Sequence, residues 1–522
     1  MSALPTEVLL HICTTIDGEL KGSPDQRRDS RITIAALART CRAFKEPALD
    51  VLWKNIDGIK PLISCLPQGV VGKTAEGKLA LGRPLFADEW KLFEQYACRV
   101  HSFTIEGSQL NQISDEVVQA FVSTPSSGLL PNLRRLKWQD DRDRFVPLLR
   151  ILLVPTIRSL TLRGYQSTRW DPSFTKLALL ASIGARYPSV REFSCTFGSE
   201  GKSDVVSKAV CDWHELVHLQ TGVLNTQALA HLASLPSLES LSFMSYDLAA
   251  DTQPQSVPIF TSKLDAVSIT VPSHSHLNQC LRDIRFRSCR IVSFKLYIDR
   301  GRRGPFDPSN LIISFSECFS PVLEQLIVET GDETYDEVLD SQRFAFSFDV
   351  IAPLLQFSRL TVLDLTWFCS LDVDDEALKY MAQAWPQLEE LYFGRGPCYP
   401  PVLTSTSRTF TALVHLIKHC RHLHRIQMRF AACSIDTDIE PFSTTTANEN
   451  LTFLDVGISP ISNPIAVACQ LHALLPNLTS VEYHEDEDSE PPLPFKEEWN
   501  QVEFCLLALT KSAEIREKRQ AK

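Results

Sequence analysis

DDEALKYMAQAWPQLEELYF, residues 374–393, contains one complete structural unit of this chain. Two aspartates come first, and apolar residues then follow at helical spacing, which is typical of a helix start and one buried helical face. Pro386 ends this pattern, and the apolar residues Leu388, Leu391 and Phe393 come directly after it. The stretch therefore predicts a helix, a turn and a short strand in succession.

The last part of this unit, an apolar residue followed by apolar residues three and five positions later, recurs along the chain. It starts at Val100, Leu133, Ile157, Val190, Leu216, Leu238, Leu264, Ile291, Leu323, Leu360, Leu388, Leu423, Leu451 and Leu478. The first and last of these are 378 residues apart over 13 intervals, so the period averages about 29 residues, at the upper edge of the range of leucine-rich repeats. The predicted fold class is an α/β repeat, in which stacked units place a curved parallel sheet inside and helices outside.

A conventional α/β domain is the alternative, because it also alternates helices and strands. It rarely has so many strands in one shared register, and we therefore favour an irregular leucine-rich-repeat solenoid. The intervals between triplets vary, which indicates loop insertions within the array.

The first 60 residues have a different pattern. LPTEVLLHICTTI (4–16) has apolar residues at helical spacing, and the polar stretch 18–31 is predicted to be a loop. The helical period resumes at residue 32, and Pro47 is predicted to break it and to begin a third short helix. Three short helices bury little apolar surface by themselves, so this head either binds a partner or caps the repeat array.

The stretches LPTEVLLHI, LARTCRAF and ALDVLWKNI, in this order, resemble the F-box motif. The resemblance covers about one tenth of the chain, and the stretch 18–31 departs from the motif by lengthening the gap between the first two helices. In that family a three-helix unit docks on a Skp-type adaptor, which bridges to a cullin scaffold in an SCF-type ubiquitin ligase. The resemblance implies that the adaptor-binding residues are Leu4, Pro5, Val8, Ile12, Leu37, Cys41, Phe44 and Trp53.

Head and irregular repeats together are similar to fungal F-box-domain proteins. The predicted domains are the F-box-like head (1–60), a linker with a connecting helix (61–99), the repeat array (100–484) and an acidic loop with a C-terminal helix or cap (485–522). The predicted function is that of a substrate-recognition subunit of an SCF-type ligase. A leucine-rich-repeat scaffold that binds proteins outside any ligase is the alternative.

A protein substrate is expected on the concave face of the array, at the residue between the last two members of each triplet. The candidates are Gln220, Ser242, Ser268, Lys295, Asp364, Tyr392, Gln427 and Asp455. Acidic residues become more frequent in this row towards the C-terminus, which suggests a partner of some basic character.

Composition excludes several other function classes. The net charge is −11 and the sequence shows no basic stripe, so we expect no nucleic-acid partner. No apolar run reaches the roughly 18 residues of a membrane span. The 15 cysteines are scattered without a C-x-x-C, and the N-terminus lacks the features of a secretory signal. Both observations favour reduced thiols and a cytoplasmic or nuclear location.

HELVH (214–218) matches the H-E-x-x-H pattern of zinc proteases, which needs both histidines on one face of a helix. Here Leu216 starts a triplet, so the second half is predicted to be a strand. Residues four apart in a strand are separated by about 13 Å, too far to share one zinc ion.

Three further stretches have alternative interpretations. HLIKHCRHLH (415–424) could hold zinc through His415 and His419, or simply carry histidines near a helix C-terminus. QGVVGKT (68–74) lacks the first glycine of a phosphate-binding loop. HEDEDSEPP (484–492) is a solvated loop or a docking patch for a basic partner. We predict no catalytic residue, no metal site and no cofactor.

Overall fold

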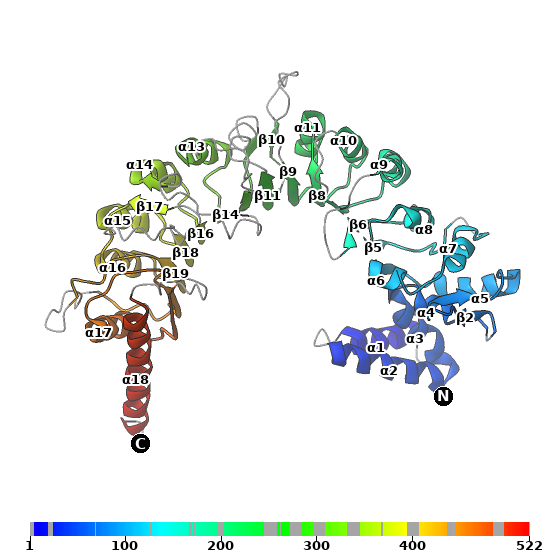
Figure 1. The fold of residues 1–522 in the computed structure, drawn as a ribbon, viewed down its shortest axis with the longest axis horizontal. Helices are drawn as coiled ribbons and strands as arrows, with labels where there is room; N and C mark the ends of the chain where they lie inside the picture. The colour runs from blue at the N-terminus through cyan, green and yellow to red at the C-terminus, as the bar shows by residue number, and fades with distance from the viewer. Residues whose placement is uncertain are drawn as a thin grey trace. The chain divides into compact units, whose positions relative to one another are not determined.

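The computed structural model describes residues 5–18, 24–67, 69–125, 128–165, 170, 173–196, 203–244, 258–261, 263–271, 284–296, 308–330, 345–366, 369–393, 407–435, 442, 445–483 and 495–520. They belong to two compact units, Met1–Ser237 and Leu238–Lys522. In each unit, helices lie along one side of a series of short parallel strands, as Figure 1 shows. Among the described residues, no helix is both long and apolar enough to cross a membrane.

Unit 1 begins with three helices, α1 (Thr6–Gly18), α2 (Pro24–Thr40) and α3 (Arg42–Lys54). Its main sheet has the strand order β1-β4-β5-β6-β7-β8, and each adjacent pair is parallel. These strands are β1 (Asn55–Asp57), β4 (Ser102–Glu106), β5 (Arg135–Gln139), β6 (Ser159–Arg163), β7 (Glu192–Cys195) and β8 (His218–Val223). The other elements are α4 (Lys60–Ile63), the antiparallel pair β2 (Val71–Lys73) and β3 (Leu79–Leu81), α5 (Ala87–Ala97), α6 (Gly107–Leu110), α7 (Asp115–Val122), η1 (Asp143–Phe145), α8 (Val146–Leu152), α9 (Phe174–Arg186), α10 (Ser203–Cys211) and α11 (Thr226–Ser234).

Unit 2 has a main sheet of the order β9-β11-β13-β14-β16-β18-β19-β20-β21, and these pairs are also parallel. The strands are β9 (Ser240–Met244), β11 (Ala266–Val271), β13 (Ile291–Leu296), β14 (Gln325–Thr330), β16 (Val362–Leu365), β18 (Glu390–Phe393), β19 (Arg425–Met428), β20 (Phe453–Asp455) and β21 (Ser480–Glu482). The remaining elements are β10 (Ile259–Phe260) with β12 (Arg285–Phe286), β15 (Ala345–Ser347) with β17 (Cys369–Asp372), α13 (Pro308–Cys318), α14 (Phe348–Ile351), η6 (Ala352–Gln356), α15 (Asp375–Ala384), α16 (Phe410–His419), α17 (Pro464–Leu474) and α18 (Lys496–Gln520).

The predicted fold class is confirmed, because a three-helix head precedes repeated strand and helix units with parallel strands. The middle members of the triplets are paired in register and buried in both units. In unit 1 they are Phe103, Leu136, Leu160, Phe193 and Leu219, and in unit 2 they include Leu241, Val267, Leu326, Leu363, Leu391, Ile426 and Leu454. Burial of each such side chain contributes roughly 1.5–3 kcal/mol, which explains why the triplet recurs.

One predicted triplet, Ile291 with Phe294 and Leu296, is wrong. The structure buries Val292 and Phe294 in register with the buried residues of β11 and β14, and Cys289 precedes them as the first buried residue. Ile291 and Cys289 are both apolar, so the local sequence allows two registers. Pairing with β11 and β14 selects one of these two registers, since a shift of β13 along its neighbours would move its side chains relative to the core.

The helices of the head also differ from the prediction. α2 begins at Pro24, inside the stretch 18–31 that was predicted to be a loop, and a proline is well tolerated in the first helical turn. α3 runs through Pro47, and the chain breaks instead at Cys41, whose backbone is extended. An internal proline costs about 3 kcal/mol. One continuous α3 offsets it by keeping Val51 in the core of the head.

The third predicted helix is shorter than expected. Residues 55–57 form β1, in which Ile56 pairs with Phe103 of β4 and is buried. The sequence pattern predicts the first strand at residue 100. The main sheet of unit 1 instead begins with β1, directly after α3.

Candidate functional site

The three helices of the head share one apolar core. Its buried residues are Cys13 of α1, Ile34 of α2, and Ala48 and Val51 of α3, and Ile16, Ala38, Phe44 and Leu52 pack against them. Burial raises the pKa of the Cys13 thiol above its usual value. The head is therefore a packed unit in which each helix contributes to the interior.

α1 has a second apolar stripe outside this core. Leu9 and Cys13 are buried, whereas Pro5 is exposed, Val8 is 41% exposed and Ile12 is half-buried. Positions 5, 8 and 12 lie on one side of an α-helix because their spacing follows its turn. The face of α1 that carries Val8 and Ile12, together with Pro5 just before the helix, is apolar and is not fully covered by the rest of the head.

The other residues implicated in adaptor binding are not equivalent to one another. Leu37 is half-buried and Cys41 is exposed. Phe44 packs against the core of the head. The ring of Trp53 is half-buried and packs against Tyr96 of α5, with 4.8 Å between ring centroids. Leu4 lies outside the described residues.

The motif comparison missed two exposed apolar side chains of the head. Leu10 of α1 is 38% exposed and Ile32 of α2 is 58% exposed. Leu10 is about 200° around the helix from Val8, so it lies on a different face. The helical period of the first stretch contained this information, because Val8 and Leu10 flank the buried Leu9 on opposite sides.

Residues 1–58 match the family described as F-box-like. The head is an F-box-like domain. No curated protein matches the chain in sequence. A chain in the crystal structure of the Rad7 and Elc1 complex in yeast is similar at 14% sequence identity and a TM-score of 0.30, over 94% of this chain and 92% of that chain.

The F-box-like head is joined to the main sheet of unit 1 without an intervening linker. The backbone N–H of His101, before β4, donates to the carbonyl of Lys54 over 2.9 Å, and β1 extends this contact. Arg99, after α5, forms ion pairs with Glu46 and Asp50 of α3. Backbone pairing, ion pairs and the ring of Trp53 thus attach α3 to the first repeats.

Five of the residues expected to bind a substrate are half-buried. They are Gln220 in unit 1 and Ser242, Ser268, Asp364 and Tyr392 in unit 2. Asp364 pairs with Tyr392 across β16 and β18, so these two are neighbours. Their partial exposure leaves part of each side chain open to solvent.

Three of the expected substrate-binding positions need correction. Gln427 and Asp455 are buried at 6% and 1% exposure. Asp455 accepts a hydrogen bond from the backbone N–H of Gly457 over 2.9 Å, so its carboxylate stabilises the turn after β20. Ser293, and not Lys295, occupies the position that aligns with Ser268. Lys295 aligns with Thr270, two residues further along β11.

The strand face of unit 2 is acidic around Asp364. The Tyr392 hydroxyl donates to Glu390 over 2.6 Å, and Asp364 accepts hydrogen bonds from Thr366. Burial raises the pKa of Asp364, although those hydrogen bonds oppose the shift, and Glu329 raises it further. Burial and Glu390 also raise the pKa of Tyr392. These groups can accept and donate hydrogen bonds to a partner.

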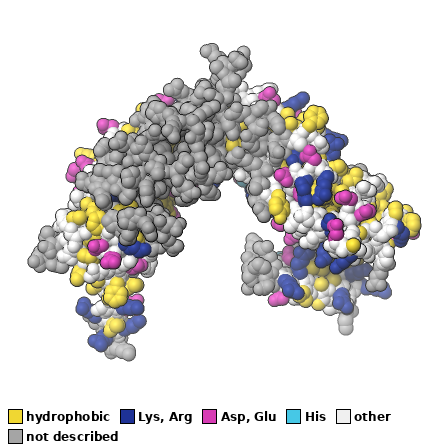
Figure 2. Space-filling model, viewed as in Figure 1, with side chains coloured by type: hydrophobic (Ala, Val, Ile, Leu, Met, Phe, Trp, Pro, Cys, Tyr) yellow, Lys and Arg dark blue, Asp and Glu magenta, His cyan; other side chains and the backbone are white. Residues whose placement is uncertain are grey.

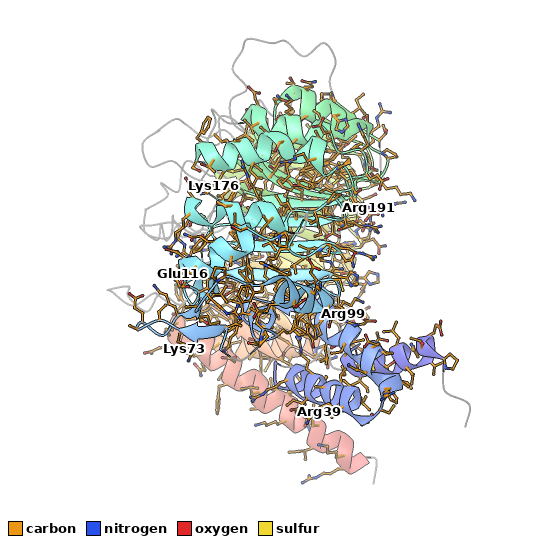
Figure 3. The ribbon with its side chains drawn as sticks, turned by 90° about the vertical axis from the view of Figure 1, so that its right-hand side faces the viewer. Arg39, Lys73, Arg99, Glu116, Lys176 and Arg191 are labelled. Atoms are coloured by element: carbon orange, nitrogen blue, oxygen red, sulfur yellow. The ribbon has the colours of Figure 1, made fainter. Side chains whose placement is uncertain are left out.

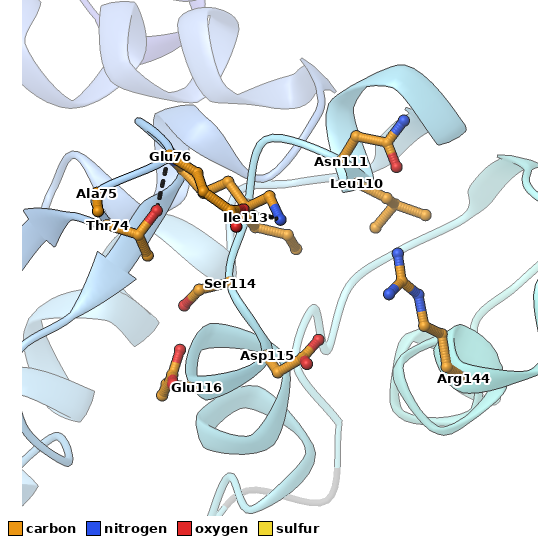
Figure 4. Close-up of a pocket in the computed structure, with 11 residues that line it drawn as sticks. Thr74, Ala75, Glu76, Leu110, Asn111, Ile113, Ser114, Asp115, Glu116 and Arg144 are labelled. Carbon is orange, nitrogen blue, oxygen red and sulfur yellow. Dashed lines mark hydrogen bonds and ion pairs between the residues drawn. The ribbon is translucent and has the colours of Figure 1, made fainter.

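Figure 4 shows a pocket of about 450 Å³ in unit 1, between the β2–β3 hairpin and the start of α7. Glu76 and Lys78 form an ion pair across 2.6 Å at one side, and Arg144 lies at the other. Ser114 and Glu116 line the pocket from the N-terminus of α7. The charged side chains that line the pocket are Glu76, Lys78, Asp115, Glu116 and Arg144.

The predicted strand within HELVH is confirmed, since His218 begins β8 and His214 precedes the strand. The two histidines therefore do not share a helical face. His415 and His419 lie on α16, and burial lowers the pKa of both. Among the described residues, no three His, Cys, Asp or Glu side chains are grouped as a metal site requires.

Residues 71–73 of QGVVGKT form β2, which pairs antiparallel with β3. A phosphate-binding loop instead lies between a strand and a helix. The segment 484–492 lies outside the described residues.

Proposed function

We propose that this protein is a substrate-recognition subunit of an SCF-type ubiquitin ligase. The F-box-like match over residues 1–58 supports the class of protein. The observation that carries the proposal is the apolar stripe of Pro5, Val8 and Ile12, which the head leaves partly exposed. Contiguous exposed apolar side chains on a small packed unit are typical of a protein-binding surface.

The head binds a Skp-type adaptor and, through it, a cullin scaffold. Leu4, Pro5, Val8, Ile12, Leu37 and Cys41 form the contact, and Phe44 and Trp53 support it from inside the head. The repeat array binds a protein substrate. This role places the protein in the cytoplasm, the nucleus or both.

The contribution to ubiquitin transfer is proximity and orientation, with no bond chemistry by this chain. The direct attachment of α3 to β1 and β4 supports this role, because it fixes the head relative to the strands of unit 1. A substrate held on those strands then keeps a defined orientation to the adaptor.

The test is co-purification of the full chain with a Skp-type adaptor. Val8→Glu places a charge in the contact and should weaken adaptor binding by at least about tenfold, since an unpaired buried charge costs several kcal/mol. Leu10→Glu is the matched control, because Leu10 lies on the same helix with nearly the same exposure but on another face. It should leave binding within about twofold.

Failure of the wild-type chain to bind the adaptor would overturn the proposal and favour a repeat scaffold outside any ligase. Equal losses in the two variants would show that the contact face is assigned wrongly. Circular dichroism of both variants checks that the head still folds.

A further inference from the structure

The residue that immediately precedes each strand of a main sheet forms a continuous row, here called the edge row. In unit 1, the backbone N–H groups of Arg134 and Arg135 donate to the carbonyl of His101, and those of Arg158 and Ser159 donate to Arg134. The pattern repeats along the sheet. The edge row of unit 1 therefore runs through Lys54, His101, Arg134, Arg158 and Arg191 and ends at Val217.

These side chains lie close together although they are far apart in the sequence. Neighbouring strands are about 4.8 Å apart, so the five positions from Lys54 to Arg191 span about 19 Å. The side chain of Arg191 lies on the same edge of unit 1 as Arg99 in Figure 3, and on the opposite edge from Lys176. Lys and Arg side chains are spread over unit 1 in the view of Figure 2.

Most of the charge in this row is not neutralised within unit 1. Lys54, Arg134 and Arg158 are exposed, and among the described residues none of them has an acidic partner within 4 Å. Arg191 is paired with Glu215 over 2.7 Å. His101 is half-buried, and its pKa is lowered by burial first and then by the positive charges of Arg134 and Lys54.

The edge row of unit 2 has the same backbone and a different charge pattern. It begins with Glu239, Asp265, Arg290 and Glu324, each bonded to the preceding one through the backbone. Arg290 lies between two acids, 2.5 Å from Asp265 and 3.5 Å from Glu324. The positive charge of Arg290 is thus balanced by the acidic residue that precedes each neighbouring strand.

We propose that the edge row of unit 1 binds an acidic, carboxylate-rich segment of a protein partner. Like charges at this spacing repel one another, and an anionic chain laid across the strands would replace that repulsion with charge-assisted hydrogen bonds. The inference rests on the proposed function, to which it adds the chemistry of the substrate. The segment binds at the edge of the sheet and crosses β4, β5 and β6.

Two features of the row favour carboxylates over phosphates and nucleic acid. Lys54, Arg134, Arg158 and Arg191 follow one another along the edge of the sheet, and Arg135 and Lys137 add two exposed cations on β5. The positive charge is therefore spread over several strands, which matches a series of single negative charges. A dianionic phosphate is instead bound by several cations that converge on one point. The residues next to the row on β4, β5 and β6 that are not buried include no aromatic side chain on which bases could stack. They are Ser102, Thr104, Arg135, Lys137, Ser159 and Thr161.

The experiment measures binding of fluorescent peptides to the full chain by anisotropy at about 0.15 M salt. The probes are a 12-residue Glu/Ser peptide, the same peptide with Gln for Glu, a phosphoserine peptide of equal net charge, and a single-stranded oligonucleotide. The wild type should bind the Glu/Ser peptide at least about tenfold tighter than each of the other three.

Arg134→Glu/Arg158→Glu should weaken binding of the Glu/Ser peptide by at least about tenfold. Arg134→Lys/Arg158→Lys keeps the charge and should retain most of the affinity. The matched control is Arg150→Glu/Arg186→Glu, an equal change of charge at exposed arginines of α8 and α9, which should leave binding nearly unchanged.

The proposal is overturned by undetectable binding of the Glu/Ser peptide, by tighter binding of the phosphopeptide or oligonucleotide, or by an equal loss in the control pair. Adaptor binding is measured on the same preparations. A chain that binds the acidic peptide but no adaptor contradicts only the ligase assignment. A chain that binds the adaptor but no acidic peptide contradicts only the edge-row assignment.

Discussion

The edge rows of units 1 and 2 occupy the same position in the repeat and differ in charge. Arg134 and Arg158 are adjacent and lack acidic partners among the described residues, whereas Arg290 lies between Asp265 and Glu324. Both rows precede strands whose buried triplets are alike. The comparison shows that the core sets the backbone of each repeat and leaves the exposed edge free to differ, which allows one fold to present different surfaces.

The largest expected effect is the loss of stability when a buried triplet residue, a feature of both units, is truncated. Leu160→Ala in unit 1 and Leu363→Ala in unit 2 each remove a buried side chain from the middle of a sheet. Each should lower the free energy of unfolding by roughly 2–5 kcal/mol, because a cavity remains in a tightly packed interior. Hydrogen exchange measured by mass spectrometry should show lost protection mainly in the unit that carries the substitution. Strongly unequal effects would contradict the view that the two cores are alike.

A smaller effect on stability is expected when an arginine of either edge row is neutralised. The sign of this effect should be opposite in the two rows, because their charges differ. Arg290→Gln removes two partly exposed ion pairs and leaves Asp265 and Glu324 unneutralised. It should slightly destabilise the protein, because solvent already screens these exposed pairs. Arg134→Gln relieves repulsion by Arg158 and should stabilise the protein by about 0.3 kcal/mol.

Urea unfolding at low and high salt measures both changes, and each should shrink as salt screens the charges. The same sign in both variants would show that the two rows are electrostatically equivalent.

The smallest effect is the pH dependence that His101 contributes to the stability of unit 1. The pKa of His101 is lowered in the folded protein, so protonation disfavours folding. The contribution of neutral His101 to the free energy of unfolding is fully present above the pKa of about 6.5 that histidine has in the unfolded chain. It is lost as the pH falls from there through the lowered pKa of the folded protein.

His101→Gln should remove part of the acid-induced loss of stability between about pH 7 and 5, measured by thermal unfolding. His424→Gln is the control at the same edge-row position in unit 2, where the ring lies 3.3 Å from Glu390. An identical flattening in both variants would contradict the role of the unit 1 charges.

Sequence patterns predicted the buried side of the fold well. The triplets at Leu133, Leu216 and Leu451 each locate a strand, because three apolar residues at this spacing must be buried together. They failed at Ile291, where two registers are locally acceptable and neighbouring strands decide. They also failed at Pro47, because local proline chemistry favours a break that packing in the head overrides.

The candidate sites were less predictable, since exposure depends on contacts with distant residues. Phe44 and Trp53 fit the motif, yet both pack within unit 1. Asp455 occupies a position expected to be exposed and instead stabilises a turn. Pro5 and Val8 remain on the surface, because the core of the head is completed by residues on the adjacent face of α1.

The order of elements, the apolar triplets and the F-box-like head follow from the sequence read alone, since each depends on spacings within a short window. The charge of the edge row does not. His101, Arg134 and Arg158 are separated by 33 and 24 residues, and no local pattern joins them. Pairing of parallel strands, which is set by burial of the core on the other side, brings their side chains to within one strand spacing. Tertiary structure alone therefore created the basic surface of unit 1.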